Sequence, residues 1–324
     1  MKIELKTVEN ADTGIMIQIC NAAFRADYEK FGECPGYGRT AQSFVDSMKN
    51  GIVKLICADG RAVGVITAFP NKNSTYIGTF AVIPEYQGKS VGTDAFKLFE
   101  KEYPNREYNL DTPLENKRCI EFYSRLGFRE KARRVDGKVQ LVCLSKDVEL
   151  FDELDDFGQP TGKLISRSDA HAAGAWHRSV HIWIIRGEKV LMQRRSMNKD
   201  SFPGCIDASC TGHVDAGEDF TDAAVRELKE DIGLTVTAGE LHCFMQQTVI
   251  TKEKNLFNRE YNVVYLLDAN VPLDALKCDE SEIDELFWID LESLRTAVEL
   301  GNKKYCIVPS EFRAIYSFIK RGIK

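Results

Sequence analysis

The stretch from Gly212 to Leu234 constrains this chain more than any other, because it places three acidic side chains close together on a predicted helix. Glu227, Glu230 and Asp231 are spaced i, i+3 and i+4, so a helix of about 3.6 residues per turn brings them to one face. Like charges at this spacing repel each other and destabilise an isolated helix. The pattern therefore indicates a bound cation, and carboxylate oxygens are the usual ligands of hard cations such as Mg²⁺.

The same helix has an apolar stripe that can pack on a sheet. Arg226 lies four residues before Glu230, and we expect the two side chains to form an ion pair that fixes the carboxylate. Gly233 follows the helix and can end it in the left-handed conformation. The apolar positions are Ala223, Ala224, Leu228 and Ile232.

The whole stretch resembles the signature of the Nudix hydrolases, in which glycine, acidic and apolar residues recur at fixed spacing. Asp231 departs from it, since a second glutamate is usual there; the carboxylate is kept, but its reach is shorter by one methylene. The resemblance implies an α/β/α sandwich and a Mg²⁺- or Mn²⁺-dependent pyrophosphohydrolase that cleaves a small-molecule diphosphate. The matching residues are Gly212, Glu218, Arg226, Glu227, Leu228, Glu230, Gly233 and Leu234.

The resemblance also implies roles for individual residues. Either Glu227 or Glu230 would be the catalytic general base. Glu260, on a predicted strand after the signature, is at a position that supplies a further metal ligand or a base. The implied metal ligands are the Gly212 carbonyl, Glu227, Glu230, Asp231 and Glu260.

Within the Nudix group, this half resembles the branch related to isopentenyl-diphosphate isomerase. That isomerase needs a cysteine immediately before a Gly-His pair, but Thr211 precedes Gly212 and His213 here, with Cys210 one residue earlier. A shift of one residue along a strand turns a side chain to the opposite face. We therefore predict a hydrolase and keep isomerisation as the alternative. The resemblance depends on Gly158, Pro160–Gly162, Arg167, His171, Trp176–His181, Gln193–Arg195, Phe202–Gly204 and Gly212–His213.

His177, His181 and His213 are three of the five histidines of the chain. The isomerase branch binds a second metal with histidines near such places. Two interpretations stay open: a second metal site, or histidines that form hydrogen bonds with their neighbours.

The first half contains a glycine-bearing turn, Gln87 to Gly92, directly after a predicted strand over 75–83. After the turn, apolar residues recur at helical spacing. A strand, a glycine turn and a helix together point backbone N–H groups and a helix N-terminus at a phosphate. The apolar stripe consists of Val91, Ala95, Leu98 and Phe99.

Residues 1–147 resemble the GNAT superfamily of acyl-CoA N-acyltransferases. Gln87, Gly88 and Gly92 match its phosphate-binding loop in part, because Ser90 stands where a glycine is usual. The later segment of the family, an asparagine followed by Tyr-x-x-x-Gly-Phe, is matched by Asn116, Tyr123, Gly127 and Phe128.

The resemblance to GNAT proteins implies an acetyl-CoA-dependent transfer to an amine acceptor. Asn116 would contact the cofactor, and Tyr123 would protonate the departing thiolate. Glu85 and Asp111 are both candidates for deprotonating the amine. The alternative is that this half is a non-catalytic binding module. The implied CoA-binding residues are Val82, Gln87, Gly88, Lys89, Val91, Gly92 and Thr93.

Length and composition agree with two domains, which we place at 1–147 and 148–324. The predicted fold class is α/β (α+β): a GNAT-like mixed sheet followed by a Nudix α/β/α sandwich, with strands expected near 235–250 and 259–268. The net charge of -6 argues against a nucleic-acid polymer as partner. No apolar run reaches eighteen residues, so no membrane span is expected. Ten cysteines without a CxxC pair predict reduced thiols and a cytoplasmic location. The oligomeric state is not predicted.

Overall fold

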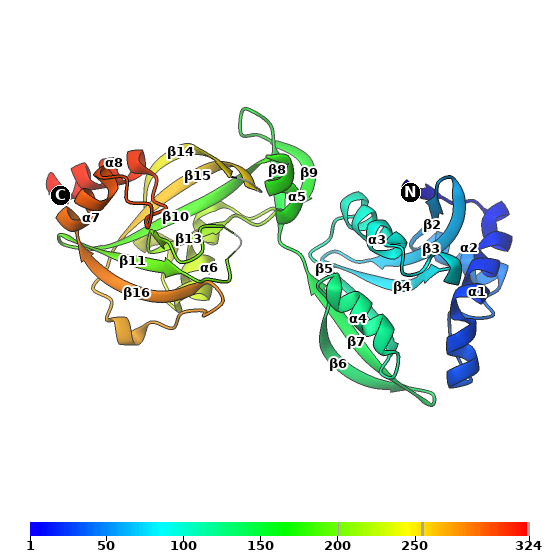
Figure 1. Cartoon of the computed structure of the whole chain (residues 1–324). Helices are drawn as coiled ribbons and strands as arrows, with labels where there is room; N and C mark the ends of the chain where they lie inside the picture. Colours follow the sequence, from blue (N-terminus) through cyan, green and yellow to red (C-terminus); the bar gives the residue numbers. More distant parts are fainter. Residues whose placement is uncertain (200, 254–255, 323–324) are drawn as a thin grey trace. The chain divides into compact units, whose positions relative to one another are not determined.

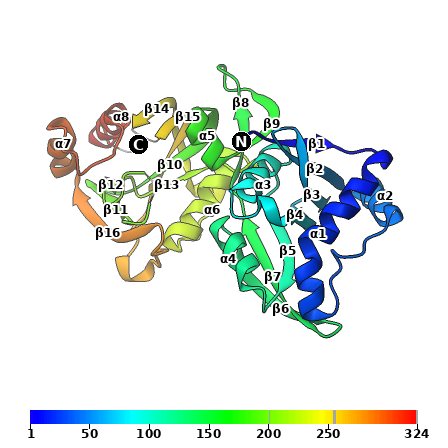
Figure 2. The ribbon, with the colours of Figure 1, turned by 45° about the vertical axis from the view of Figure 1, so that its right-hand side comes forward.

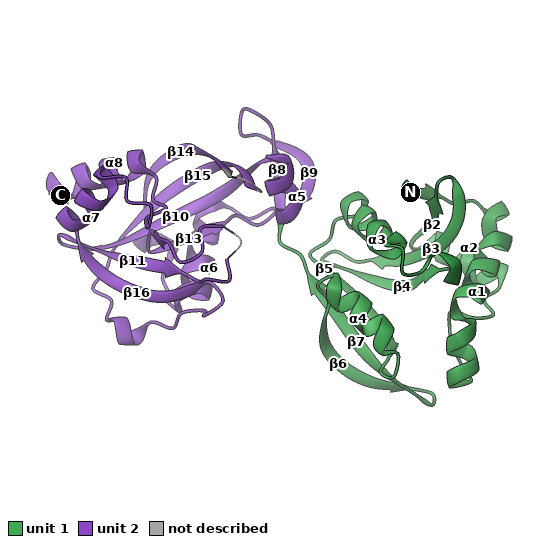
Figure 3. Ribbon diagram, in the orientation of Figure 1, with its two compact units in different colours: residues 1–150 green, residues 151–324 purple. Residues whose placement is uncertain are grey.

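The computed structural model describes residues 1–199, 201–253 and 256–322 of the chain. It divides into two compact units, Met1–Leu150 and Phe151–Lys324 (Figure 3). Each unit is built around its own mixed sheet with helices on both faces (Figure 1). The α/β fold class is therefore confirmed, while the domain boundary after Asp147 stays a prediction.

The first unit contains a seven-stranded sheet in the order β1-β2-β3-β4-β5-β7-β6. All neighbouring strands are antiparallel except β4 and β5, which are parallel. The strands are β1 (Ile3–Thr7), β2 (Ile52–Ala58), β3 (Arg61–Pro70), β4 (Ser74–Val82), β5 (Glu107–Pro113), β6 (Arg129–Asp136) and β7 (Val139–Asp147).

Helices cover both faces of this sheet (Figure 2). The apolar layer between the sheet and helices α1 and α2 includes Met16, Ile19 and Phe44. The layer between the sheet and helices α3 and α4 includes aromatic residues such as Phe96 and Tyr123. The helices are α1 (Thr13–Phe31), α2 (Ala41–Asn50), α3 (Val91–Glu102) and α4 (Lys117–Arg125).

The parallel pairing of β4 with β5 is short. It joins Ser74–Tyr76 to Glu107–Asn109 and does not continue toward Val82. The pairing of β4 with β3 does continue to Val82, with an irregularity opposite Thr67 and Ala68. The last part of β4 is therefore not paired with β5.

The second unit contains a nine-stranded sheet with the central order β12-β11-β10-β15-β14. β10 also pairs with β13 and β8, β11 with β16, and β8 with β9. The strands are β8 (Leu150–Leu154), β9 (Pro160–Ser166), β10 (Trp176–Arg186), β11 (Lys189–Arg195), β12 (Ile206–Asp207), β13 (Cys210–His213), β14 (His242–Glu253), β15 (Leu256–Asp268) and β16 (Ile283–Asp290).

Side chains of β10 alternate between the two faces of this sheet, as the period of a strand requires. Val180, Ile182 and Ile184 pack in the layer under α6, whereas Trp183 and Ile185 belong to the layer under α7 and α8. Figures 1 and 2 show α6 on one side of the sheet and α7 and α8 on the other. The helices are α5 (Arg167–Ala173), α6 (Phe220–Ile232), α7 (Leu291–Glu299) and α8 (Pro309–Lys320).

One strand begins later than expected. Residues 235–241 are not part of the predicted strand near 235–250, which starts at His242. Thr237 and Glu240 form a capping box around a single 3-10 turn, and these local hydrogen bonds compete with strand pairing. In the described part of the chain, no helix combines the length and the apolar character needed to cross a membrane.

Candidate functional site

In the second unit, Gly212 allows a carboxylate to lie against the backbone of β13. A Cβ atom at this position would be only 2.1 Å from Cδ of Glu227. α6 begins at a clear cap, where the Asp219 side chain accepts hydrogen bonds from the backbone N–H groups of Thr221 and Asp222. Cap, helix and glycine together place the Glu227 carboxylate over the end of the strand.

Arg226 holds the carboxylates of this region in place. Its guanidinium donates to Glu218 at 2.9 Å, to Glu227 at 2.7 Å and to Glu230 at 3.0 Å. It also donates to the His213 carbonyl at 2.9 Å. The i, i+4 ion pair expected between Arg226 and Glu230 is therefore present.

The three acidic residues of the signature differ in their surroundings. Glu227 and Asp231 are largely buried, while the Glu230 side chain is 59% exposed. Burial, followed by the nearby Asp231 charge, raises the pKa of Glu227 to about 8. Burial, followed by the Glu282 charge, raises the pKa of Asp231 to about 6. A nearby cation would remove the cost of ionising both groups.

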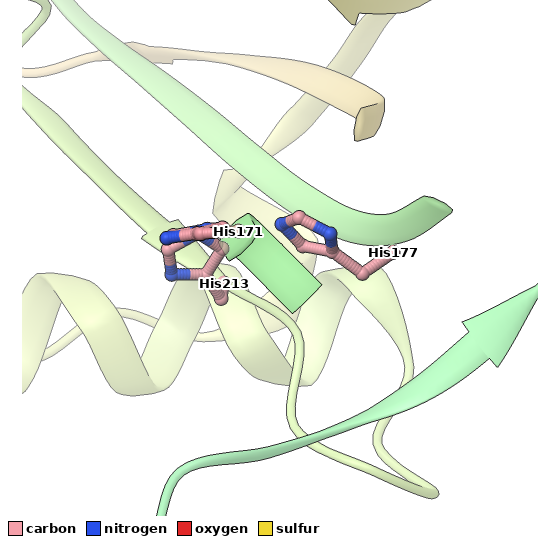
Figure 4. A group of neighbouring side chains, drawn as sticks. All are labelled: His171, His177 and His213. Carbon is pink, nitrogen blue, oxygen red and sulfur yellow. The ribbon is translucent and has the colours of Figure 1, made fainter. Parts of the chain in front are cut away.

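On the other face of the sheet, three histidines converge: His171 from α5, His177 from β10 and His213 from β13 (Figure 4). Their ligand nitrogens lie within 4.8 Å of one another, and the rings pack around Phe151. Burial, with the neighbouring His213 and His177, lowers the pKa of His171 to about 4. His171 is therefore neutral near pH 7, as a metal ligand must be.

Glu260 of β15 completes this group. Its Oε1 atom is 3.5 Å from Nε2 of His213 and 3.9 Å from Nε2 of His177. Burial alone would raise its pKa, but the hydrogen bond and charge of His213, with His177, hold the pKa at about 2. Nε2 of His171 is buried without a hydrogen-bond partner among the described residues. This donor set fits a divalent transition metal.

In the first unit, the glycine-bearing loop connects β4 to α3. Gln87 Nε2 donates to the Val82 carbonyl at 2.7 Å, so the loop is tied to the strand end. Gly88 and Ser90 both have positive φ, at 71° and 64°, and Ser90 immediately precedes α3. The loop therefore requires a left-handed backbone at Ser90, where a side chain costs about 1–2 kcal/mol.

The remaining predicted cofactor-binding residues lie around this loop. Val91 is buried and begins α3, and Lys89 is exposed with Nζ 5.6 Å from the Tyr86 ring. A Cβ atom on Gly92 would approach the Phe122 ring to 3.2 Å. Thr93 is half-buried in the first turn of α3. Gly92 thus lets α3 pack closely on α4.

α4 contains the other two predicted residues of the first unit. The Asn116 side chain caps the helix by accepting from the Cys119 N–H at 3.3 Å, and donates to the Asp27 carboxylate at 3.2 Å. Tyr123 is buried between the rings of Phe122 and Phe128. Burial raises the pKa of the Tyr123 hydroxyl, so it keeps its proton.

The two candidate bases of the first unit have different partners. Asp111 accepts a hydrogen bond from Arg134 at 2.9 Å and one from the Tyr76 hydroxyl at 3.1 Å. Although burial opposes it, these hydrogen bonds and one from Cys143 lower the pKa of Asp111. Asp111 is therefore a weak proton acceptor, whereas Glu85 lies on an exposed turn after β4.

Comparison with known families agrees with both halves. The model described as "NUDIX domain" matches residues 175–309, and the one described as "Acetyltransferase (GNAT) family" matches residues 17–128. The chain is a GNAT acetyltransferase domain fused to a Nudix hydrolase domain. Both domains indicate enzymatic activity, as predicted.

Known relatives of the Nudix domain carry two kinds of name. "Nudix hydrolase 3" of Arabidopsis thaliana is 31% identical over 182 residues, 53% of this chain, and the chain spans only 23% of that protein's length. "Isopentenyl-diphosphate Delta-isomerase" of Cereibacter sphaeroides is 32% identical over 136 residues, which cover 42% of this chain and 75% of the relative. Hydrolase and isomerase names thus both occur among the relatives.

A solved structure with similarity to the GNAT domain is the ribosomal-protein-S18-alanine N-acetyltransferase from Escherichia coli. It is 15% identical and covers 45% of this chain and 94% of its own, with a TM-score of 0.38.

The histidine group of the Nudix domain differs from the grouping considered from the sequence. His177 and His213 belong to it, but His181 does not; His171 takes its place. Nδ1 of His181 instead lies 2.9 Å from a carboxylate oxygen of Glu311 in α8. His171 belongs to the segments that resemble the isomerase branch, and this was the available signal. In the GNAT domain, no pattern in the sequence indicated that Asp27 would accept a hydrogen bond from Asn116.

The alternation of β13 decides where Thr211 and Cys210 point. Cys210 packs in the layer under α6, and its thiol donates to Asp231 at 3.5 Å. Gly212 faces Glu227 on the same side. Thr211 alternates to the side of His213, so a hydroxyl, and not a thiol, lies on the histidine face.

Proposed function

We propose that the Nudix domain hydrolyses a small-molecule diphosphate with the help of Mg²⁺ or Mn²⁺. The observation that carries this proposal is the concentration of buried ligand side chains at the ends of β10, β13 and β15. Bound divalent cations would neutralise the diphosphate and lower the pKa of a bound water.

Two ligand sets are available on the two sides of β13. Glu227, Glu230, Asp231 and the Gly212 carbonyl form the first. The second consists of the three histidines with Glu260. It is supported by Nε2 of His171, which is buried and has no hydrogen-bond partner in the described part of the chain. His213 connects the sets, since its backbone carbonyl accepts a hydrogen bond from Arg226 at 2.9 Å and its Nε2 atom lies 3.5 Å from Glu260.

Glu227 is the general base in this proposal. Burial and the Asp231 charge favour the protonated form of Glu227 when no cation is bound. A bound cation would offset them and leave Glu227 ionised, as a group that takes a proton from an attacking water must be. Arg226 keeps the carboxylate in one orientation through the hydrogen bond at 2.7 Å. Glu230, bound to the same guanidinium, is the second candidate for this role.

A second candidate function is isomerisation of an isoprenoid diphosphate, because the Cereibacter relatives bear that name. The position of Thr211 argues against it, since a hydroxyl replaces the expected acid on the histidine face. Incubation with isopentenyl diphosphate in heavy water tests this directly. Deuterium in a rearranged product would replace the hydrolase proposal with the isomerase.

A substrate screen tests the hydrolase proposal. The full chain is incubated with nucleotide and non-nucleotide diphosphates in Mg²⁺ or Mn²⁺, and phosphate release is measured. We expect turnover of at least one diphosphate, abolished by a chelator and restored by excess metal. Turnover that is insensitive to chelation would contradict the assignment.

For the GNAT domain, we propose acetyl-CoA-dependent transfer to an amine. The unpaired side of β4 near Val82 would bind the pantetheine, and the N–H groups of Gln87 to Thr93 the pyrophosphate. Asn116 would contact the cofactor, and Tyr123 would give its proton to the departing thiolate. Glu85 or a water chain would accept the proton of the amine.

Calorimetry with acetyl-CoA, followed by an amine panel, separates an enzyme from a binding module. Tyr123→Phe should lower acetyl transfer by about 100-fold or more, with little change in acetyl-CoA affinity. Binding without turnover in the wild type would favour the module.

A further inference from the structure

A chain of buried and half-buried polar side chains crosses the face of the Nudix sheet that α8 covers. Asn262 of β15 donates to the Ser179 hydroxyl at 3.0 Å. Gln247 of β14 donates to Asn262 at 3.2 Å and also to Glu311 of α8. The surrounding layer is apolar, so these groups form a continuous polar path within it.

Glu311 is the charged end of this path. Its side chain is 1% exposed, and it accepts from Trp183 Nε1 at 2.6 Å and from His181 Nδ1 at 2.9 Å. A buried carboxylate is costly unless a cation lies beside it. Burial opposes the charge on His181, but Glu311 raises the pKa of His181 to about 9. The pair is therefore an imidazolium and a carboxylate near neutral pH.

The geometry leaves one ring nitrogen of His181 for a ligand. Both described hydrogen bonds of the ring use Nδ1, and the side chain is 16% exposed. The Nε2–H group therefore has no assigned acceptor among the described residues. Other charged groups that act on His181 are Asp207 of β12 and Glu260 of β15. Asp207 is itself paired with Arg195 at 3.3 Å.

His181 lies on the same face as the histidine group. It is four residues after His177 on β10, about 13 Å along the strand. It pairs with Thr211 of β13, whereas Ser179 pairs with His213. A substrate held at the histidines and extending along β10 would thus reach the His181 ring.

We propose that His181, held as a cation by Glu311, binds an anionic phosphate oxygen of the substrate of the Nudix domain. This inference rests on the proposed diphosphate hydrolysis. His181 donates its Nε2–H to the phosphate, and Glu311 acts as a positioning residue that fixes the ring and its charge.

The test measures binding of methylenediphosphonate, which cannot be hydrolysed, to the full chain in Mg²⁺ by calorimetry. His181→Gln and Glu311→Gln should each weaken binding by about 10- to 100-fold, the effect of losing a charge-assisted hydrogen bond. His242→Gln is the matched control, because His242 is exposed on β14 and should not affect binding. With a hydrolysable diphosphate, His181→Gln should raise KM and leave kcat nearly unchanged.

Loss of His181 alone leaves Glu311 buried without its cation and can unfold the domain. The double variant His181→Gln with Glu311→Gln removes both charges and should remain folded while binding the diphosphonate weakly. Binding by the double variant as tight as that of the wild type would overturn the inference.

Imidazole nitrogen NMR supplies a readout that a purely structural ion pair would not change. At pH 8, His181 should be an imidazolium whose Nε2 resonance moves when methylenediphosphonate is added, while that of His242 stays in place. A resonance that does not move, in a wild type that binds the compound, would show that the pair is structural only.

The inference and the proposed function can fail separately. If His181→Gln hydrolyses a diphosphate with an unaltered KM, the inference about His181 fails and the proposed hydrolysis stands. If the chain binds methylenediphosphonate through His181 but hydrolyses no diphosphate, the proposed hydrolysis fails and the inference about His181 stands. A wild type that does not bind methylenediphosphonate but still hydrolyses a diphosphate also counts against the inference.

Discussion

The two domains differ in the polar groups that they bury. Among the described residues of the GNAT domain, these are hydroxyl groups and one lysine: Ser47, Lys54, Thr67, Thr75, Thr79 and Thr112. In the Nudix domain they include a histidine and three carboxylates: His177, Ser179, Gln193, Ser196, Ser209, Asp231, Glu260, Asn262 and Glu311.

This difference corresponds to two ways in which the proposed sites would bind a ligand, through backbone groups or through charged side chains. The GNAT loop offers backbone groups at Gln87–Thr93, which do not depend strongly on side-chain charge. The Nudix domain instead buries carboxylates whose charge must be offset by a neighbouring cation, by hydrogen bonds or by a ligand, at a cost to stability. Single changes that remove a charge should therefore affect the Nudix domain far more than single changes in the GNAT loop.

The largest effect is expected from Glu227→Gln and Glu230→Gln. Each keeps the shape of the side chain but removes a negative charge, and should lower kcat for diphosphate hydrolysis by more than about 100-fold. Glu285→Gln on β16, which pairs with Arg194 at the surface, is the control and should retain activity. Mg²⁺-dependent turnover at the wild-type rate in both variants would show that the ligands lie elsewhere.

Gly212→Ala tests the close approach of the Glu227 carboxylate to β13. The added methyl group would meet Cδ of Glu227 at 2.1 Å, so the side chain must move. We expect a loss of about 1–3 kcal/mol in the free energy of unfolding, measured with urea, and a loss of hydrolysis. Gly239→Ala, where a Cβ atom meets nothing within 4 Å, should change neither quantity noticeably.

Alkaline pH tests the ion pair between His181 and Glu311. Because the folded pKa of His181, about 9, is above the ordinary value of 6.5, the stabilisation is complete below pH 6.5 and is lost as the pH rises through 9. The loss should reach at most about 3 kcal/mol in urea unfolding between pH 6.5 and 10. The double variant of His181 and Glu311, with Asp207 and Glu260 unchanged, should show a smaller decrease.

The smallest effect is expected in the GNAT loop. Ser90→Gly relieves a positive φ of 64° but gives the unfolded chain more freedom, so stability should rise by less than about 1 kcal/mol. Acetyl-CoA affinity, measured by calorimetry, should stay the same or increase slightly. A large loss of affinity would mean that the Ser90 side chain binds the cofactor, and would weaken the contrast between the domains.

Much of the chain could be predicted from local patterns. The spacing of Arg226 and Glu230 predicts their ion pair because one helical turn separates them. The strand predicted over 75–83 lies close to the observed bounds of β4, Ser74–Val82. The strand near 235–250 was predicted too early, because the local bonds between Thr237 and Glu240 compete with pairing in a way that periodicity does not reveal.

By itself, the sequence determined the two families and the acidic motif of α6, since these depend on residues close together along the chain. Only the tertiary structure decided that His171 joins His177 and His213, and that Glu311 lies beside His181. The members of these groups come from separate helices and strands, up to 130 positions apart. Their meeting depends on how α5 and α8 pack on the sheet, which no local spacing specifies.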